Sequence, residues 1–159
     1  MKRMVVAVFG LLLTNESAEA ATASDGSALA LASLVAEHSP LLSAYEKKVM
    51  ALMFSGNLHF SFSANKKISV QADSVVCRAS DVDITLHSCN FTFGQKTAAL
   101  KGRAAHELFA TLVEVGVPSE GAAGSIYESL SHLICTIDPN EVKQRGGGGA
   151  DCTFNPGSP

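Results

Sequence analysis

The chain has 159 residues, with 12 basic against 15 acidic residues, a formal net charge of −3 and no tryptophan. A slightly acidic chain without a basic patch argues against a nucleic-acid-binding surface, so we expect no nucleic-acid partner. The length is that of a single domain, whose core must be built mainly from aliphatic residues, alanine and phenylalanine.

The first twenty residues have the order of a secretory signal peptide. Lys2 and Arg3 precede an unbroken apolar run over 4–13, and the small-x-small sequence Ala18-Glu19-Ala20 follows. An apolar run of 10 residues is too short to span a bilayer, which needs about 20 residues. We therefore expect a signal peptide over 1–20, cleavage near Ala21, no membrane span after signal removal, and a secreted or periplasmic location.

Two helical segments are expected next. Residues 21–38 form either a leader or a short helix, because 24–38 is rich in alanine and leucine. Ser39 and Pro40 are a good helix start, a capping serine followed by proline at the first position, and Gly56 supplies the stop. Residues 39–159 are expected to form a single α+β domain.

Period-two alternation of apolar and polar residues then predicts a four-strand meander. The strands are expected over 58–63, 68–77, 82–93 and 97–100. In the third strand the apolar positions change parity, so we expect a β-bulge near His87-Ser88.

The C-terminal part is expected to hold two helices and two short strands. The helices are predicted over 103–115 and from Ser119 to about Leu133, and the strands over 134–137 and 152–154. Runs of each element type, rather than strict alternation, indicate an α+β fold with a mostly antiparallel sheet and helices packed on one face.

The four cysteines, Cys77, Cys89, Cys135 and Cys152, are interpreted as two disulfides, because an even count in an exported chain is typical of a disulfide framework. Local spacing favours Cys77–Cys89 and Cys135–Cys152, although three pairings are open. The first pair needs a turn longer than two residues, or a bulge. Zinc is disfavoured, since there is no tightly spaced ligand pair. We therefore expect no metal and no cofactor.

Motif searches find little catalytic chemistry. The glycine-rich stretch 146–149 lacks the Lys-Ser/Thr of a phosphate loop, His106-Glu107 is not followed by the second histidine of HExxH, and no GxSxG is present. One polar cluster remains: Asp83, Thr85 and His87 are expected on the same side of one strand. We interpret it as a solvated strand face, which predicts that His87→Ala changes stability by no more than about 0.5 kcal/mol.

Two functions follow as hypotheses. The first is a small, exported, disulfide-stabilised and non-catalytic domain that binds another exported or cell-surface protein, or a small ligand, through its loops. The alternative is a small exported hydrolase with a site near Asp83 and His87, joined by Asp151 or His59.

Overall fold

The computed structural model describes residues 20–62, 66–122, 124–146 and 148–157, so the expected signal peptide over 1–20 lies outside the described residues except for Ala20. The described helices are α1 (Asp25–Ala36), α2 (Ala44–Phe54), α3 (Gly102–Glu114) and α4 (Pro139–Arg145), with a 3-10 turn, η1 (Ile84–Leu86). The strands are β1 (Ala21–Ser24), β2 (Ile68–Ala79), β3 (Ser88–Phe93), β4 (Lys96–Lys101), β5 (Glu120–Ala122), β6 (Ser125–Ile137) and β7 (Ala150–Pro156). None of these helices has the length and apolar character needed to cross a membrane.

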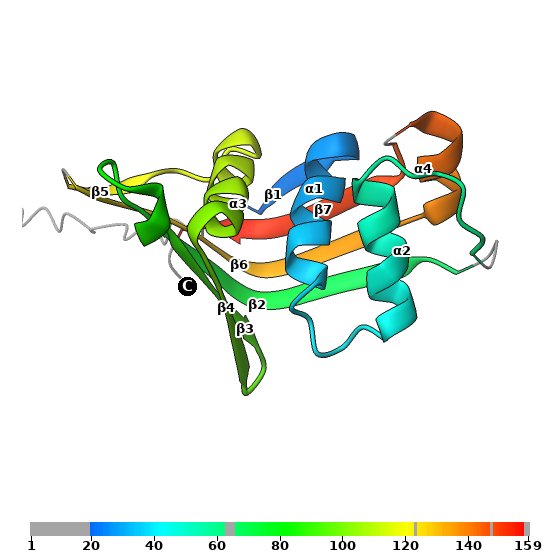
Figure 1. Cartoon of the computed structure of the whole chain (residues 1–159), viewed down its shortest axis with the longest axis horizontal. Coiled ribbons are helices and arrows are strands. Elements are labelled where there is room, and N and C mark those ends of the chain that lie inside the picture. The colour runs from blue at the N-terminus through cyan, green and yellow to red at the C-terminus, as the bar shows by residue number, and fades with distance from the viewer. Residues whose placement is uncertain (1–19, 63–65, 123, 147, 158–159) are drawn as a thin grey trace, which may run out of the picture.

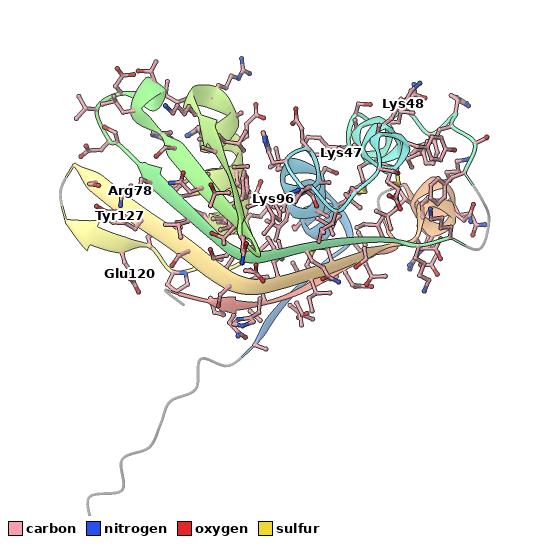
Figure 2. All side chains as sticks on the ribbon, turned by 90° about the horizontal axis from the view of Figure 1, so that it is seen from below. Lys47, Lys48, Arg78, Lys96, Glu120 and Tyr127 are labelled. Carbon is pink, nitrogen blue, oxygen red and sulfur yellow. A yellow bond between two sulfur atoms is a disulfide. The ribbon has the colours of Figure 1, made fainter. Side chains whose placement is uncertain are left out.

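The strands form one sheet in the order β1-β7-β6-β2-β3-β4, and β5 extends it beside β6. Every pairing is antiparallel. Helix α1 packs on β7, β2 and β6, and α3 packs on β2, β3 and β6 (Figure 1). Figure 2 shows these helices and α2 on the same side of the sheet. The α+β class, the antiparallel sheet and the helices on one face are therefore confirmed.

The hydrophobic core lies between the helices and the sheet. Helix α1 contributes Ala28, Leu31 and Val35, all fully buried, so residues 25–36 of the segment 21–38 form a packed helix. Strand β1 precedes it and pairs with β7, which the sequence analysis did not predict. The buried aromatic side chains are Phe60, Phe91, Phe93 and Phe154.

Both disulfides have the favoured pairing, Cys77–Cys89 and Cys135–Cys152. Each joins residues directly opposite one another on neighbouring strands, β2 with β3 and β6 with β7. All four cysteines are buried in the core. The second disulfide closes a segment that contains α4, whose N-terminus is capped by the Asp138 carboxylate.

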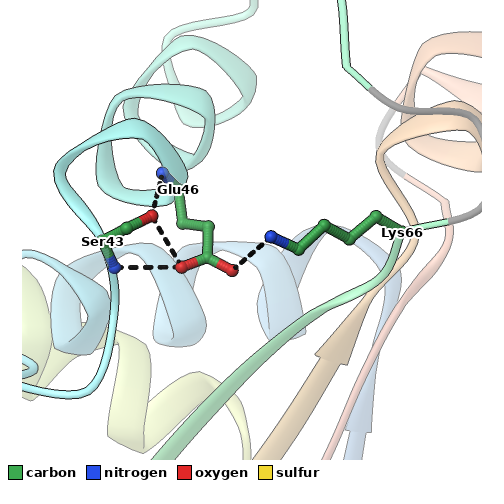
Figure 3. A network of polar contacts seen from close by, with 3 residues as sticks. All are labelled: Ser43, Glu46 and Lys66. Carbon is green, nitrogen blue, oxygen red and sulfur yellow. Dashed lines mark hydrogen bonds and ion pairs between the residues drawn. The ribbon is translucent and has the colours of Figure 1, made fainter.

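Helix α2 begins later than predicted. The Ser43 Oγ accepts a hydrogen bond from the Glu46 N–H, and the Glu46 carboxylate accepts one from the Ser43 N–H at 2.9 Å (Figure 3). This reciprocal capping box satisfies two helix-end donors and takes precedence over the Ser39-Pro40 start. Lys66 approaches the same carboxylate at 3.5 Å. The Ser43 hydrogen bonds and then Lys66 hold the pKa of Glu46 below its ordinary value.

The first predicted strand of the meander is wrong within the described residues. Residues 58–62 belong to no strand, although Phe60 is buried and its neighbours are exposed. Phe62 stacks on Tyr45, and the Tyr45 hydroxyl donates to the Ser61 carbonyl oxygen at 2.7 Å. The alternation of apolar and polar residues in this segment reflects one buried face. Helix α2 covers that face, so the segment forms no β-ladder.

The predicted helix over 119–133 is also wrong. This segment forms β5 and the first part of β6, joined through Gly124 at a φ of +93°. Strand β6 pairs with β2 from Ile126 to Ile137, and side chains 128–131 are all buried. Pairing with a long central strand outweighs the helical spacing of the apolar residues, because local propensity is a weak prior.

Candidate functional site

The predicted polar cluster lies on a loop rather than on a strand. Residues Ser80–His87, called here the 80–87 loop, connect β2 to β3, and the Cys77–Cys89 disulfide joins the two strands at its base. The loop contains η1, so the predicted strand over 82–87 and the β-bulge near His87-Ser88 are both wrong. The chain returns from Cys77 to Cys89 through a turn longer than two residues, which is one of the two possibilities expected from the sequence.

Side-chain hydrogen bonds to the backbone explain this local structure. The Ser80 Oγ accepts from the Val82 N–H at 3.2 Å, and an Asp83 carboxylate oxygen accepts from the Thr85 N–H at 2.8 Å. Such bonds offer the backbone an alternative to a β-ladder. The hydrogen bonds from Thr85, and to a smaller extent the nearby His87, hold the pKa of the exposed Asp83 below its ordinary value.

His87 closes the loop from inside. Its side chain is only 6% exposed, and its Nε2 donates a hydrogen bond to the Ser80 carbonyl oxygen at 2.9 Å. The Nδ1 of His87 lies 3.2 Å from the Nδ1 of His106 on α3, and the His87 ring also packs against Phe109. Because a carbonyl only accepts, a neutral His87 carries its proton on Nε2, and His106 then donates through Nδ1. The expectation that His87 belongs to a solvated face is therefore wrong.

The outer side of the loop exposes three aliphatic side chains. Val82 is 85% exposed, Ile84 45% and Leu86 64%, and we call them the aliphatic triplet. In the strand predicted over 82–93, these residues would lie on the face opposite Asp83, Thr85 and His87. The loop also carries Asp81 and Asp83, and neither lysine nor arginine.

The β5–β6 hairpin lies beside the loop. A Cβ placed on Gly124 would be 3.9 Å from an Asp81 carboxylate oxygen, so the two turns adjoin. On the neighbouring strand ends, the Arg78 guanidinium lies 5.0 Å from the centre of the Tyr127 ring, and Glu120 is the register partner of Tyr127. Figure 2 shows these three residues at the same end of the sheet.

The other residues considered for a hydrolytic site are not near the loop. Asp151 pairs with Thr136, which in turn pairs with Ser69 at the start of β2, whereas the 80–87 loop follows the end of β2. His59 neighbours Phe60, whose carbonyl oxygen accepts a hydrogen bond from Lys143 on α4, and α4 follows the end of β6 that pairs with the start of β2. Among the described residues no group of three or more His, Cys, Asp or Glu side chains could hold a metal ion. Asp83 and His87 make their hydrogen bonds within the loop and to α3, so the hydrolase alternative stays a prediction.

The sequence analysis missed a buried carboxyl group below α3. Glu128 is 1% exposed, and the Ser119 hydroxyl donates to its Oε1 at 2.5 Å. Its Oε2 has no hydrogen-bond partner among the described residues. Burial raises the pKa of Glu128, and the Ser119 hydrogen bond opposes part of that increase. The sequence analysis missed Glu128 because it assigned residues 119–133 to a helix, in which Glu128 lies outside the stripe of apolar residues.

Comparison with protein-family models, curated proteins and solved structures finds no significant match for this chain. The functional argument therefore rests on the fold and on the loop just described.

His87→Ala should lower the free energy of unfolding by about 1–3 kcal/mol, because it removes a buried hydrogen-bonding group and leaves the Ser80 carbonyl oxygen without its donor. Urea unfolding measures the change. The exposed Thr85 is the matched control, and Thr85→Ala should stay within about 0.5 kcal/mol of the wild type. Equal effects of the two substitutions would contradict a structural role for His87.

Proposed function

We propose that this protein is an exported, non-catalytic domain that binds another exported or cell-surface protein through the aliphatic triplet of the 80–87 loop. The observation that carries the proposal is the simultaneous exposure of Val82, Ile84 and Leu86 on one loop whose ends are joined by a disulfide. Exposed apolar groups that cluster in this way are typical of interaction sites.

The energetics favour such a role. Burying an exposed valine, leucine or isoleucine fully gives roughly 1.5–3 kcal/mol, so three neighbouring side chains can contribute substantially to binding. The Cys77–Cys89 disulfide and the buried His87 already restrict the loop. A restricted loop loses less conformational entropy when it binds, which leaves more of the contact energy for affinity.

Charge indicates the chemistry of the partner. The charged groups of the loop are Asp81 and Asp83, both acidic. They fit an apolar patch bordered by lysine or arginine, and they repel the anionic head groups of a lipid surface. A protein surface therefore suits this loop better than an anionic membrane.

Export is supported by two features. Two disulfides are consistent with an oxidising, non-cytoplasmic compartment. The sequence of residues 1–20 has the order of a secretory signal peptide.

The test is a comparison of three immobilised proteins exposed to the exported and cell-surface fractions. The triple variant Val82→Ser, Ile84→Ser, Leu86→Ser should weaken capture of the wild-type partner by about a hundredfold or more, since about 2.8 kcal/mol or more of apolar burial is lost. Val113→Ser is the matched control, because Val113 is 50% exposed on α3.

The stability of both variants should remain within about 0.5 kcal/mol of the wild type, as is usual for surface positions. A triple variant that still captures every wild-type partner would refute the proposal. Binding of the wild type to protein-free vesicles, lost in the triple variant, would replace the protein partner with a membrane.

A further inference from the structure

The central strand β2 is paired along only half of one side. Strand β6 pairs with it from Ile68 to Ala79, whereas β3 pairs with it only from Ser74 to Arg78. Figure 1 shows the β3–β4 hairpin turning away, so that no strand of the described residues lies on that side of the other half of β2. We call residues 68–73, on the side away from β6, the β2 edge.

The β2 edge has unused backbone hydrogen-bonding capacity. Strand β6 is the only strand partner of residues 68–72 within the described part of the chain. In an antiparallel pair, alternate residues turn their N–H and C=O groups away from the partner strand. The β2 edge therefore presents donors and acceptors in the spacing of a strand, which another extended chain can satisfy.

A cavity adjoins one end of this edge. It has a volume of about 340 Å³, and its lining residues are Leu41, Gln71, Ala72, Asp73, Phe93, Gly94, His132, Leu133 and Ile134. Leu41, from the connection between α1 and α2, is 71% exposed, and Ile134 is 49% exposed. The Gly94 N–H donates a hydrogen bond to the Asp73 carboxylate, which fixes the β3–β4 turn at the end of the edge.

A β-bulge lies beside the cavity. Between Ser131 and Ile134 the register of β6 against β7 shifts by one residue, and His132 has a φ of +53°. A bulge bends its strand and increases the local twist. A positive φ is uncommon for residues other than glycine, and bulges are over-represented at sheet edges and beside active sites.

In the described part of the sheet, strands β4, β1 and β5 also have a free edge, and each differs from the β2 edge. Strand β4 begins and ends with a lysine, which disfavours pairing with another chain, β1 has four residues and β5 has three. The β2 edge combines unpaired strand backbone over residues 68–72 with an adjoining cavity of side-chain size.

We infer that the β2 edge binds an extended segment of a partner polypeptide, which adds a strand along residues 68–73 and places one bulky apolar side chain in the cavity. The basic side chains Lys67 and Lys96 are exposed near the two ends of this edge, and the nearby Asp73 carboxylate already accepts from Gly94. The segment that fits best therefore carries acidic residues on both sides of an alternating apolar and polar stretch. This site is separate from the 80–87 loop and goes beyond the proposed function.

The probe is a labelled eight-residue peptide with the sequence Glu-Thr-Val-Thr-Phe-Thr-Val-Glu. Titration into the folded, oxidised protein should shift the amide resonances of residues 68–73 and slow their hydrogen exchange. A peptide methylated at alternate backbone nitrogens should not bind, because it cannot complete the ladder. Equal binding of the methylated peptide, shifts confined to β1 or β4, or no binding of the parent peptide would each overturn the inference.

Leu41→Asp should weaken binding of this peptide by at least about tenfold, because it places a charge at the mouth of the cavity. Val113→Asp is the matched control, on an exposed position of α3, and should bind as the wild type does. The triple variant of the aliphatic triplet should also bind the peptide normally. Loss of peptide binding in that variant would place the peptide on the 80–87 loop and refute a separate site at the β2 edge.

Discussion

Replacing both cysteines of either disulfide with alanine should lower the free energy of unfolding by about 3 kcal/mol, and removing both disulfides should cost roughly twice that. The Cys77–Cys89 and Cys135–Cys152 bonds span 12 and 17 residues, so each closes a loop of similar size in the unfolded chain. The difference between them should be only about 0.3 kcal/mol, because loop-closure entropy grows slowly with length.

Urea unfolding of the two double alanine variants and of the quadruple variant measures these costs. All four cysteines are buried, and alanine is apolar, so none of these substitutions places a polar group in the core. The native protein should show no titratable thiol before reduction, and chelators should leave its stability unchanged. Four free thiols together with bound zinc would contradict the disulfide assignment.

The disulfide framework could be predicted because it depends on local features. The cysteine count and the expected export favour disulfides, the short separations favour neighbouring partners, and the structure confirms Cys77–Cys89 and Cys135–Cys152. Helix α3 and the strand that begins at Ile68 could be predicted for the same reason, because the apolar residues of each follow a clear period that ends at a clear stop.

The candidate site could not be predicted in the same way. Val82, Ile84 and Leu86 alternate with polar residues, as they would on a half-buried strand, yet all three are exposed. The deciding interactions are the turns capped by Ser80 and Asp83, whose side chains bond the backbone. Period alone cannot distinguish an apolar residue that faces the core from one that faces solvent. The aliphatic triplet therefore becomes visible only in the folded structure.

The assignment of residues 119–133 failed for a non-local reason. Their apolar spacing fits a helix, but β2 offers a long partner for β6, and Gly121 and Gly124 allow the hairpin at positive φ. The error also concealed Glu128, which is the register partner of Cys77 and therefore lies on the core face of the sheet. Long-range strand pairing, which a single sequence does not report, decided both outcomes.

We also expect Glu128 to have a large effect on the free energy of unfolding. Its carboxyl group is buried, Oε2 has no partner among the described residues, and burial raises its pKa. The folded state thus binds the carboxyl proton more tightly than the unfolded state does. Its contribution to stability is fully present below the ordinary glutamate pKa, and it is lost as the pH rises through the raised pKa of the folded protein.

Glu128→Gln should therefore stabilise the protein at neutral pH by about 1–3 kcal/mol, because the amide keeps the shape and the acceptor for Ser119 while it removes a buried charge. Near pH 4, where the carboxyl group is protonated, the two proteins should agree within about 0.5 kcal/mol. Urea unfolding from pH 4 to pH 8 measures the difference, and Glu120→Gln on exposed β5 is the matched control. Parallel pH profiles for Glu128→Gln and the wild type would mean that Glu128 ionises as freely in the folded chain as in the unfolded one, and the buried charge would then have found a partner or water.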